Sequence, residues 1–183
     1  MVAVWLAASA STPLWLLGRS GRVSDQSELV DRLQHCGSSV SARRCDAGYW
    51  AEASSVVSTE APLCSLLHAG GVLRDATMAN MTHAHCDAVF APKVHGLHNM
   101  QLTMGLSPMT AVVMFSSIAS LLGGVGQANY TAANAALDAA AAVQQSAGMA
   151  GSSVQWGTWV GGGMALRDPS TIQRAERVGL GVV

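Results

Sequence analysis

The sequence predicts an α/β protein built on a doubly wound parallel sheet. Short apolar runs that do not alternate with polar residues are typical of parallel strands buried on both faces. Segments with helical periodicity lie between them, so strand and helix alternate along the chain. The predicted strands cover residues 14–17, 63–67 and 111–115, with weaker candidates at 40–45 and 153–156. The predicted helices cover residues 26–36, 84–104 and 130–145.

Composition limits the chain to a few classes of protein. Its 183 residues are 50% hydrophobic and 11% charged, which suits one compact domain spanning residues 1–183. The net charge of −1 leaves no broad cationic surface, so nucleic acid and anionic membrane are poor candidate partners. No apolar run approaches the ~20 residues of a membrane span. The 4 cysteines occur singly, which favours reduced thiols and a cytoplasmic setting.

Residues that could bind a ligand or take part in catalysis follow the predicted strands. In a doubly wound sheet the ligand lies beyond the carboxyl ends of the strands, where the strand order reverses. Polar or glycine-rich turns follow four strands in succession: residues 18–21, Asp46, residues 68–71, and Ser116 with Ser117. We therefore expect these residues to meet at one edge of the sheet.

The beginning of the chain departs from a complete dinucleotide-binding fold. Such folds open with a strand and a Gly-x-Gly-x-x-Gly turn that feeds a helix. Residues 1–8 already resemble the end of that helix, so we expect the first strand and its phosphate-binding turn to be absent. The absent strand would be central, which leaves the strands on either side without a bridging neighbour. On this interpretation the chain is a partial domain, truncated at both ends.

The most specific motifs are residues 115–120, Gly123-Gly124 and residues 127–134. With them the chain resembles the short-chain dehydrogenase/reductase superfamily, and more narrowly the ketoreductase domain of modular polyketide synthases. Matches in the same order support the resemblance at residues 16–21, 45–46, 68–73, 91–94, 156–159 and 163–165. The resemblance implies a Rossmann-type fold and reduction of a β-ketoacyl thioester on an acyl carrier protein, within a chain that carries other synthase domains.

The resemblance implies four catalytic residues. Tyr130 donates a proton to the ketone oxygen, and Ser117 polarises the carbonyl group. Lys93 lowers the pKa of the phenol and binds the ribose, while Asn134 supports the proton relay. Most of the superfamily has lysine four residues after the tyrosine. Here Asn134 occupies that position and Lys93 lies upstream, the exchanged order of the polyketide ketoreductases.

The resemblance also implies NADPH as the cofactor. The guanidinium of Arg19, assisted by Ser20, pairs with the 2′-phosphate, and Asp46 accepts a hydrogen bond from the adenine amino group. Ala69, Gly70 and Gly71 let the backbone approach the ribose and nicotinamide, and Tyr130 and Lys93 also contact the cofactor. Gly70 stands where the family usually has alanine, which predicts added local flexibility.

Three residues bear on stereochemistry in the resemblance. Asp75 is the final residue of Leu73-Arg74-Asp75, where B-type ketoreductases carry Leu-Asp-Asp. Leu122 stands where A-type enzymes carry tryptophan, and Asn129 fits the B pattern. Val125 replaces a common proline. Together these residues favour the B type and a D-hydroxyl product.

Other hypotheses stay open beside the enzyme. A non-catalytic ketoreductase remnant would explain the absent glycine-rich turn, whereas the exchanged lysine and asparagine argue against a free-standing short-chain reductase. His83, His85 and Cys86 lie close together in the sequence, as metal ligands can. Their spacing identifies no further ligand, so we expect no metal site. We expect Trp156 and Trp159 to pack against other side chains rather than to line the cofactor site.

Overall fold

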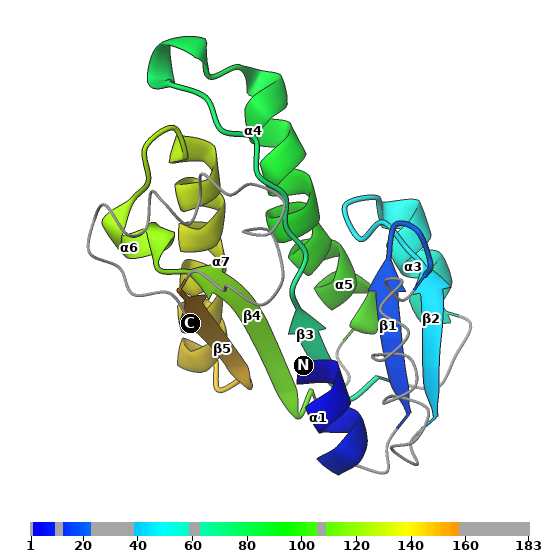
Figure 1. Cartoon of the computed structure of the whole chain (residues 1–183). Coiled ribbons are helices and arrows are strands. Elements are labelled where there is room, and N and C mark those ends of the chain that lie inside the picture. The colour runs from blue at the N-terminus through cyan, green and yellow to red at the C-terminus, as the bar shows by residue number, and fades with distance from the viewer. Residues whose placement is uncertain (1, 10–12, 23–38, 59–62, 106–108, 158–183) are drawn as a thin grey trace.

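The computed structural model describes residues 2–9, 13–22, 39–58, 63–105 and 109–157 (Figure 1). The strands are β1 (Leu14–Gly18), β2 (Val40–Arg44), β3 (Ser65–His68), β4 (Ala111–Ser117) and β5 (Gly151–Trp156). The helices are α1 (Val2–Ser9), α3 (Trp50–Ser58), α4 (His83–Phe90), α5 (Gly96–Met104), α6 (Ala119–Leu122) and α7 (Ala128–Ser146), with short turns η1 (Met78–Asn80) and η2 (Ala91–His95). The predicted helix at 26–36, Trp159 and the match at 163–165 lie outside the described residues.

The strands form two parallel sheets. One contains β1 and β2, paired from Leu14 opposite Val40 to Gly18 opposite Arg44. The other has the order β3-β4-β5. Within the described residues no strand bridges β1 and β3, and the sheets are divided where the sequence predicts that a strand is lacking. The predicted parallel α/β architecture is thereby confirmed.

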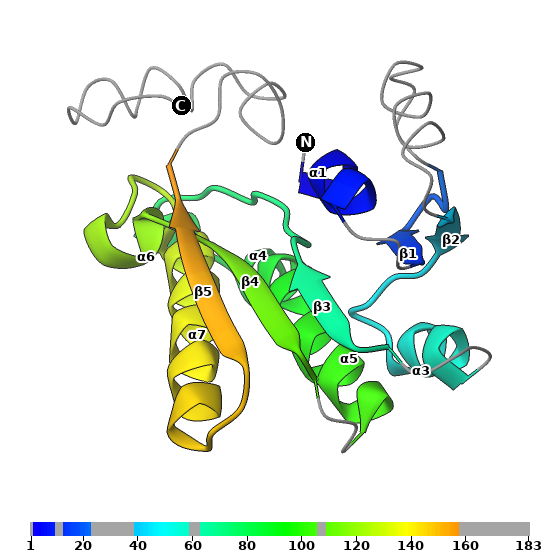
Figure 2. The ribbon, with the colours of Figure 1, turned by 90° about the horizontal axis from the view of Figure 1, so that it is seen from below.

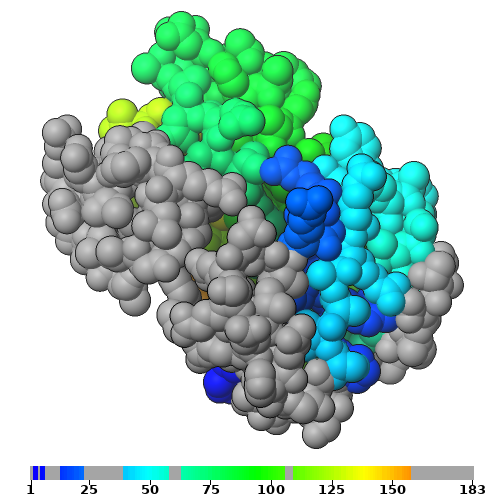
Figure 3. Space-filling view, turned by 45° about the vertical axis from the view of Figure 1, so that its right-hand side comes forward, coloured from blue at the N-terminus to red at the C-terminus, as the bar shows by residue number. Residues whose placement is uncertain are grey.

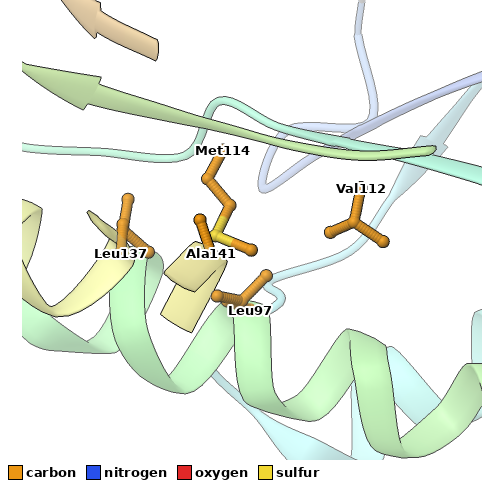
Figure 4. Packing of buried hydrophobic residues seen from close by; sticks show 5 residues of the cluster. All are labelled: Leu97, Val112, Met114, Leu137 and Ala141. Atoms are coloured by element: carbon orange, nitrogen blue, oxygen red, sulfur yellow. The ribbon is translucent and has the colours of Figure 1, made fainter. Parts of the chain in front are cut away.

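Helices cover one face of the three-stranded sheet. Figure 2 shows α4, α5 and α7 on the same side of β3, β4 and β5. Burial alternates along β4, where Val112, Met114 and Ser116 are fully buried and the residues between them are half-buried. The core cluster drawn in Figure 4 joins two of these side chains to α5 and α7. Its members are Leu97, Val112, Met114, Leu137 and Ala141.

The predicted helix at 84–104 is divided into three parts by a π-helical turn. α4 opens on a capping box, in which Thr82 accepts from the backbone N–H of His85 and the His85 ring accepts from that of Thr82. Pro92, which lacks an N–H, then interrupts the hydrogen-bond ladder inside η2. The N–H of Gly96 reaches back to the carbonyl of Ala91, the spacing of a π-helix. Such turns occur often at functional sites.

Helix α7 is the longest helix of the described residues, with 19 residues. It begins two residues before the predicted boundary at Tyr130 and packs against β4, β5, α4 and α6. No helix in the described ranges is long and apolar enough to cross a bilayer.

Candidate functional site

The four predicted catalytic residues come from three neighbouring elements. The strand arrows of Figure 1 point toward one end of the molecule, where Ser117 ends β4 and Tyr130 lies in the first turn of α7. η2 packs against α7 and contributes Lys93. The exposed fractions of Tyr130, Lys93 and Asn134 are 8%, 3% and 0%. A phenol, an ammonium and an amide are therefore held together away from bulk water.

Lys93 is the single lysine of the sequence, and its charged end is buried. Its Nζ donates to the carbonyl oxygen of Phe115 at 3.0 Å and lies 5.4 Å from the centre of the Tyr130 ring. Burial lowers the pKa of Lys93 from 10.5 to about 8, and the charge of Asp138 opposes that shift. Lys93 is thus mainly protonated at neutral pH, and its proton is held more weakly than that of a solvated lysine.

Tyr130 lies between Lys93 and the polar side chains of α7 and β4. Burial raises the pKa of the Tyr130 phenol, while hydrogen bonds from Asn134 and Ser117 lower it by a smaller amount. The net direction is upward, because desolvation of the phenolate outweighs these hydrogen bonds. That Lys93 lowers the pKa of this phenol stays a prediction. A protonated phenol at neutral pH is a proton donor.

Asn134 and the two serines link α7 to the end of β4. The amide nitrogen of Asn134 donates to the carbonyl of Tyr130 at 2.8 Å, and Asn134 Oδ1 is buried without a hydrogen-bond partner among the described residues. Ser116 donates to the carbonyl of Asn134 at 3.3 Å. The Ser117 hydroxyl accepts from the N–H of Ala119 at 3.2 Å and also reaches Tyr130. Of the two serines, Ser117 therefore lies beside the phenol and Ser116 fixes the helix.

His68 supports Lys93 from the end of β3, a role that sequence reasoning missed. Its Nε2 lies 2.7 Å from the carbonyl oxygen of Lys93, and because a carbonyl can only accept, Nε2 carries the proton. Burial lowers the pKa of His68, which favours the neutral ring. A Cβ added at Gly70 would lie 2.8 Å from the carbonyl oxygen of Pro92. Gly70 thus allows β3 and η2 to approach closely, a physical reason for glycine other than the expected flexibility.

The predicted NADPH-binding residues lie partly on the other sheet. Arg19 and Ser20 are exposed after β1. Figure 3 shows the blue surface of this part of the chain beside the cyan surface of the part that contains β2. Asp46 follows β2, where its Oδ1 accepts from the N–H of Gly48 at 3.1 Å and its own N–H donates to Glu52 at 2.8 Å. The side chain of Asn99 on α5 donates to the carbonyl of Ala47 at 2.9 Å and joins the two sheets.

These residues fit a phosphorylated dinucleotide in part. The exposed guanidinium of Arg19 suits a phosphate, and Gly70 and Gly71 place no side chain of their own in the turn after β3. One oxygen of Asp46 already closes its own turn, which leaves the other for an adenine amino group.

The residues predicted to control stereochemistry surround the start of α7. Asn129 is 3% exposed, and its side chain donates to the carbonyls of Arg74 and His85 at 2.9 and 3.0 Å. Gln127 donates to the Asp75 carboxylate at 3.1 Å. Leu122 on α6 is 63% exposed. Asn129 and Gln127 therefore fasten the loop that follows β3 to the helix that carries Tyr130.

The histidines near Cys86 have partners in α4. His83 Nδ1 lies 2.9 Å from an oxygen of Asp87, and His85 completes the capping box of the helix. Across the described ranges no group of three His, Cys, Asp or Glu residues is arranged to hold a metal ion. Trp156 packs against Phe115, with ring centres 5.4 Å apart.

Comparison with known proteins connects this geometry to one family. The family model described as "KR domain" matches residues 1–161. Polyketide synthase GfsB of Streptomyces halstedii is 38% identical over an alignment of 171 residues that covers 91% of this chain and 3% of that protein. Mycoketide-CoA synthase of Mycobacterium tuberculosis is 39% identical over an alignment of 150 residues that covers 77% of this chain and 4% of that protein. The chain thus spans a few per cent of the length of these relatives.

Solved structures show the same likeness. A structure of A-type ketoreductases from a modular polyketide synthase has a TM-score of 0.88 and 34% identity, over 96% of this chain and 38% of that one. A C2-type ketoreductase from a modular polyketide synthase has a TM-score of 0.83 and 25% identity, over 99% of this chain and 39% of that one.

Proposed function

The chain belongs to the ketoreductase (KR) domains of modular polyketide synthases, and from this membership we propose that it reduces a β-ketoacyl thioester to the β-hydroxyacyl form. The substrate would be carried on an acyl carrier protein, and other synthase domains would be its partners. The observation that carries the proposal is the buried Tyr130 phenol, which lies beside both Ser117 and the Lys93 ammonium.

The chain's own residues would donate the proton, stabilise the charge that remains and return a proton to the donor. When bound, NADPH supplies a hydride to the carbonyl carbon. Tyr130 would give its phenolic proton to the carbonyl oxygen as negative charge develops there, with Ser117 donating a second hydrogen bond. Lys93 would then stabilise the phenolate by its charge. Asn134 Oδ1 is suited to hold a water that returns a proton, because it is buried and has no described protein partner.

Residues on both sheets would hold the cofactor. Arg19 and Ser20 would bind the 2′-phosphate, and Asp46 would accept from the adenine. The turn formed by Ala69, Gly70 and Gly71 would lie against the ribose and nicotinamide. The support for NADPH over NADH is the exposed guanidinium of Arg19 at the end of β1.

The Tyr130→Phe variant tests the reaction most directly. Removal of one hydroxyl should abolish turnover of a β-ketoacyl thioester while the dissociation constant for NADPH changes little, because the ring and its packing remain. Turnover by the full-length protein is followed through NADPH absorbance, and cofactor binding through its fluorescence. Retained turnover would contradict the assignment. Failure of the wild type to bind NADPH would instead support a non-catalytic remnant.

The B-type, D-hydroxyl outcome is the finer part of the proposal. It depends on Asp75, Asn129 and Leu122 and not on overall likeness, because both A-type and C2-type structures are similar to this chain. The contacts that support it are those of Gln127 with Asp75 and of Asn129 with the same loop. Chiral chromatography of the β-hydroxyacyl product decides between the two hydroxyl configurations.

A further inference from the structure

Asp138 lies on α7 one helical turn beyond Asn134, and four polar side chains from other elements converge on it. Ser153 on β5 donates to its Oδ1, and Gln155 on β5 donates to its Oδ2 at 2.9 Å. Ser120 on α6 and Ser116 on β4 also lower the pKa of the carboxyl group, and the Ser116 hydroxyl itself donates to the carbonyl of Asn134. The Gln155 amide additionally reaches Ser120 at 3.2 Å. One carboxylate therefore connects α7 to three neighbouring elements.

This network favours the charged form of Asp138. Burial raises the pKa of the carboxyl group, but the hydrogen bonds outweigh burial and the net pKa is lowered. Donors aimed at both oxygens also restrict the rotation of the side chain. Asp138 is consequently an oriented anion at neutral pH.

The charge of this anion acts on the site described above. Lys93 is 3% exposed, and an ammonium so far from water needs a compensating charge. Asp138 acts on Lys93 through its charge. It lies one helical turn after Asn134, whose carbonyl accepts from Ser116, and Ser116 directly follows Phe115, whose carbonyl accepts from the Lys93 ammonium. Other titratable groups in contact with Lys93 among the described residues are His68 from β3 and Tyr130 from α7. Of these groups, Asp138 is the one that is anionic in the resting site.

We infer that Asp138 is a positioning residue that fixes α7 against β5 and β4 and provides the counter-charge for the Lys93 ammonium beside Tyr130. The inference depends on the proposed function, since it gives the network a role in proton transfer. A purely structural clamp would hold the helix without affecting how the reaction depends on pH. The pH dependence therefore separates the two roles.

The Asp138→Asn variant of the full-length protein removes the charge and keeps the shape. Lys93 should then lose its proton at a lower pH. The alkaline limb of the pH profile, where kcat/KM falls as Lys93 loses its proton, should therefore shift to lower pH. We expect the ratio of kcat/KM at alkaline pH to that at neutral pH to fall several-fold, with NADPH affinity little changed. The Asp138→Glu variant should restore the limb, because it restores the charge.

Two matched controls separate charge from scaffold. Ser153→Ala removes one donor to Asp138 but leaves the carboxylate, and it should lower stability without moving the alkaline limb. Asp87→Asn removes an exposed carboxylate on α4 and should change neither property. An Asp138→Asn enzyme that loses stability but keeps the wild-type limb would overturn the inference.

Folding failures are also informative. If Asp138→Asn does not fold, Asp138→Ser provides a smaller neutral variant for the same profile. If neither neutral variant folds while Asp138→Glu does, Asp138 serves the fold alone and the inference is wrong. Tyr130→Phe is assayed in parallel. Residual turnover there refutes the proposed function, whereas an inactive Tyr130→Phe with an unshifted Asp138→Asn profile refutes only the role of Asp138.

Discussion

Replacement of Lys93 by methionine should stabilise the fold while it abolishes reduction. Burial lowers the pKa of Lys93 from 10.5 to about 8. At neutral pH the side chain is protonated in the folded and the unfolded chain, so the shift corresponds to a cost of about 3 kcal/mol for burying the charge. Methionine gives up the hydrogen bond to Phe115, worth about 1 kcal/mol. The expected net gain in the free energy of unfolding is about 2 kcal/mol.

The sign of the pH dependence follows from the same shift. Between about pH 8 and pH 10.5 the unfolded chain holds a proton on Lys93 that the folded chain has lost. The stability of the wild type therefore rises with pH in this interval, and the advantage of Lys93→Met shrinks. Below about pH 8 the advantage is constant, because both states bind the proton.

Urea denaturation at neutral and alkaline pH, followed by tryptophan fluorescence, measures this difference. Lys93→Arg serves as a control, since a guanidinium stays charged: it should show no gain at neutral pH, and it should fall below the wild type between about pH 8 and pH 10.5, where only the wild type gains stability. The reasoning is refuted if Lys93→Met is less stable than the wild type at neutral pH, or if its advantage persists unchanged above pH 10.5.

Two further substitutions examine the cofactor residues and the close contact between β3 and η2. Arg19→Ala should weaken NADPH binding by about 10- to 100-fold, as expected for loss of a charged phosphate contact, and leave NADH binding unchanged. Equal weakening of both cofactors in fluorescence titrations would exclude a 2′-phosphate contact. Gly70→Ala should lower the free energy of unfolding by about 1–3 kcal/mol, because its Cβ would meet the Pro92 carbonyl at 2.8 Å. Gly18→Ala, which meets nothing within 4 Å, is the matched control in thermal unfolding.

Continuous apolar runs located β1, β3 and β4, whereas the more polar β2 and β5 gave weaker signals. All five predicted strands lie within a few residues of the observed ones. Helix α3 was not predicted, since residues 50–58 mix tryptophan, serine and alanine, and three of the eight side chains described at 50–57 are exposed. The π-helical turn was also missed. Apolar periodicity runs unbroken through 84–104, although Pro92 in that stretch was a visible signal.

The catalytic residues were predicted from family motifs, because periodicity and spacing in the sequence could not have identified them. Lys93 lies far from Tyr130 in the sequence, and no periodicity relates them. Their approach depends on η2 packing against α7. For the same reason the supporting residues could not be predicted: His68 hydrogen-bonds to the backbone carbonyl of Lys93, and the Asp138 carboxylate accepts from two side chains of β5. Such roles exist only after the chain has folded.

The raised pKa of Tyr130 and the lowered pKa of Lys93 have one physical cause. Burial disfavours each charged form, the phenolate and the ammonium, while they are considered separately. The resting pair therefore holds a neutral phenol, ready to donate, next to an ammonium that remains protonated at neutral pH. Proton donation by Tyr130 would create a phenolate within about 5.4 Å of that ammonium, measured from ring centre to Nζ, in a site that screens charges poorly. The cation then stabilises the state after transfer more than the resting state, which is the difference in binding that catalysis requires.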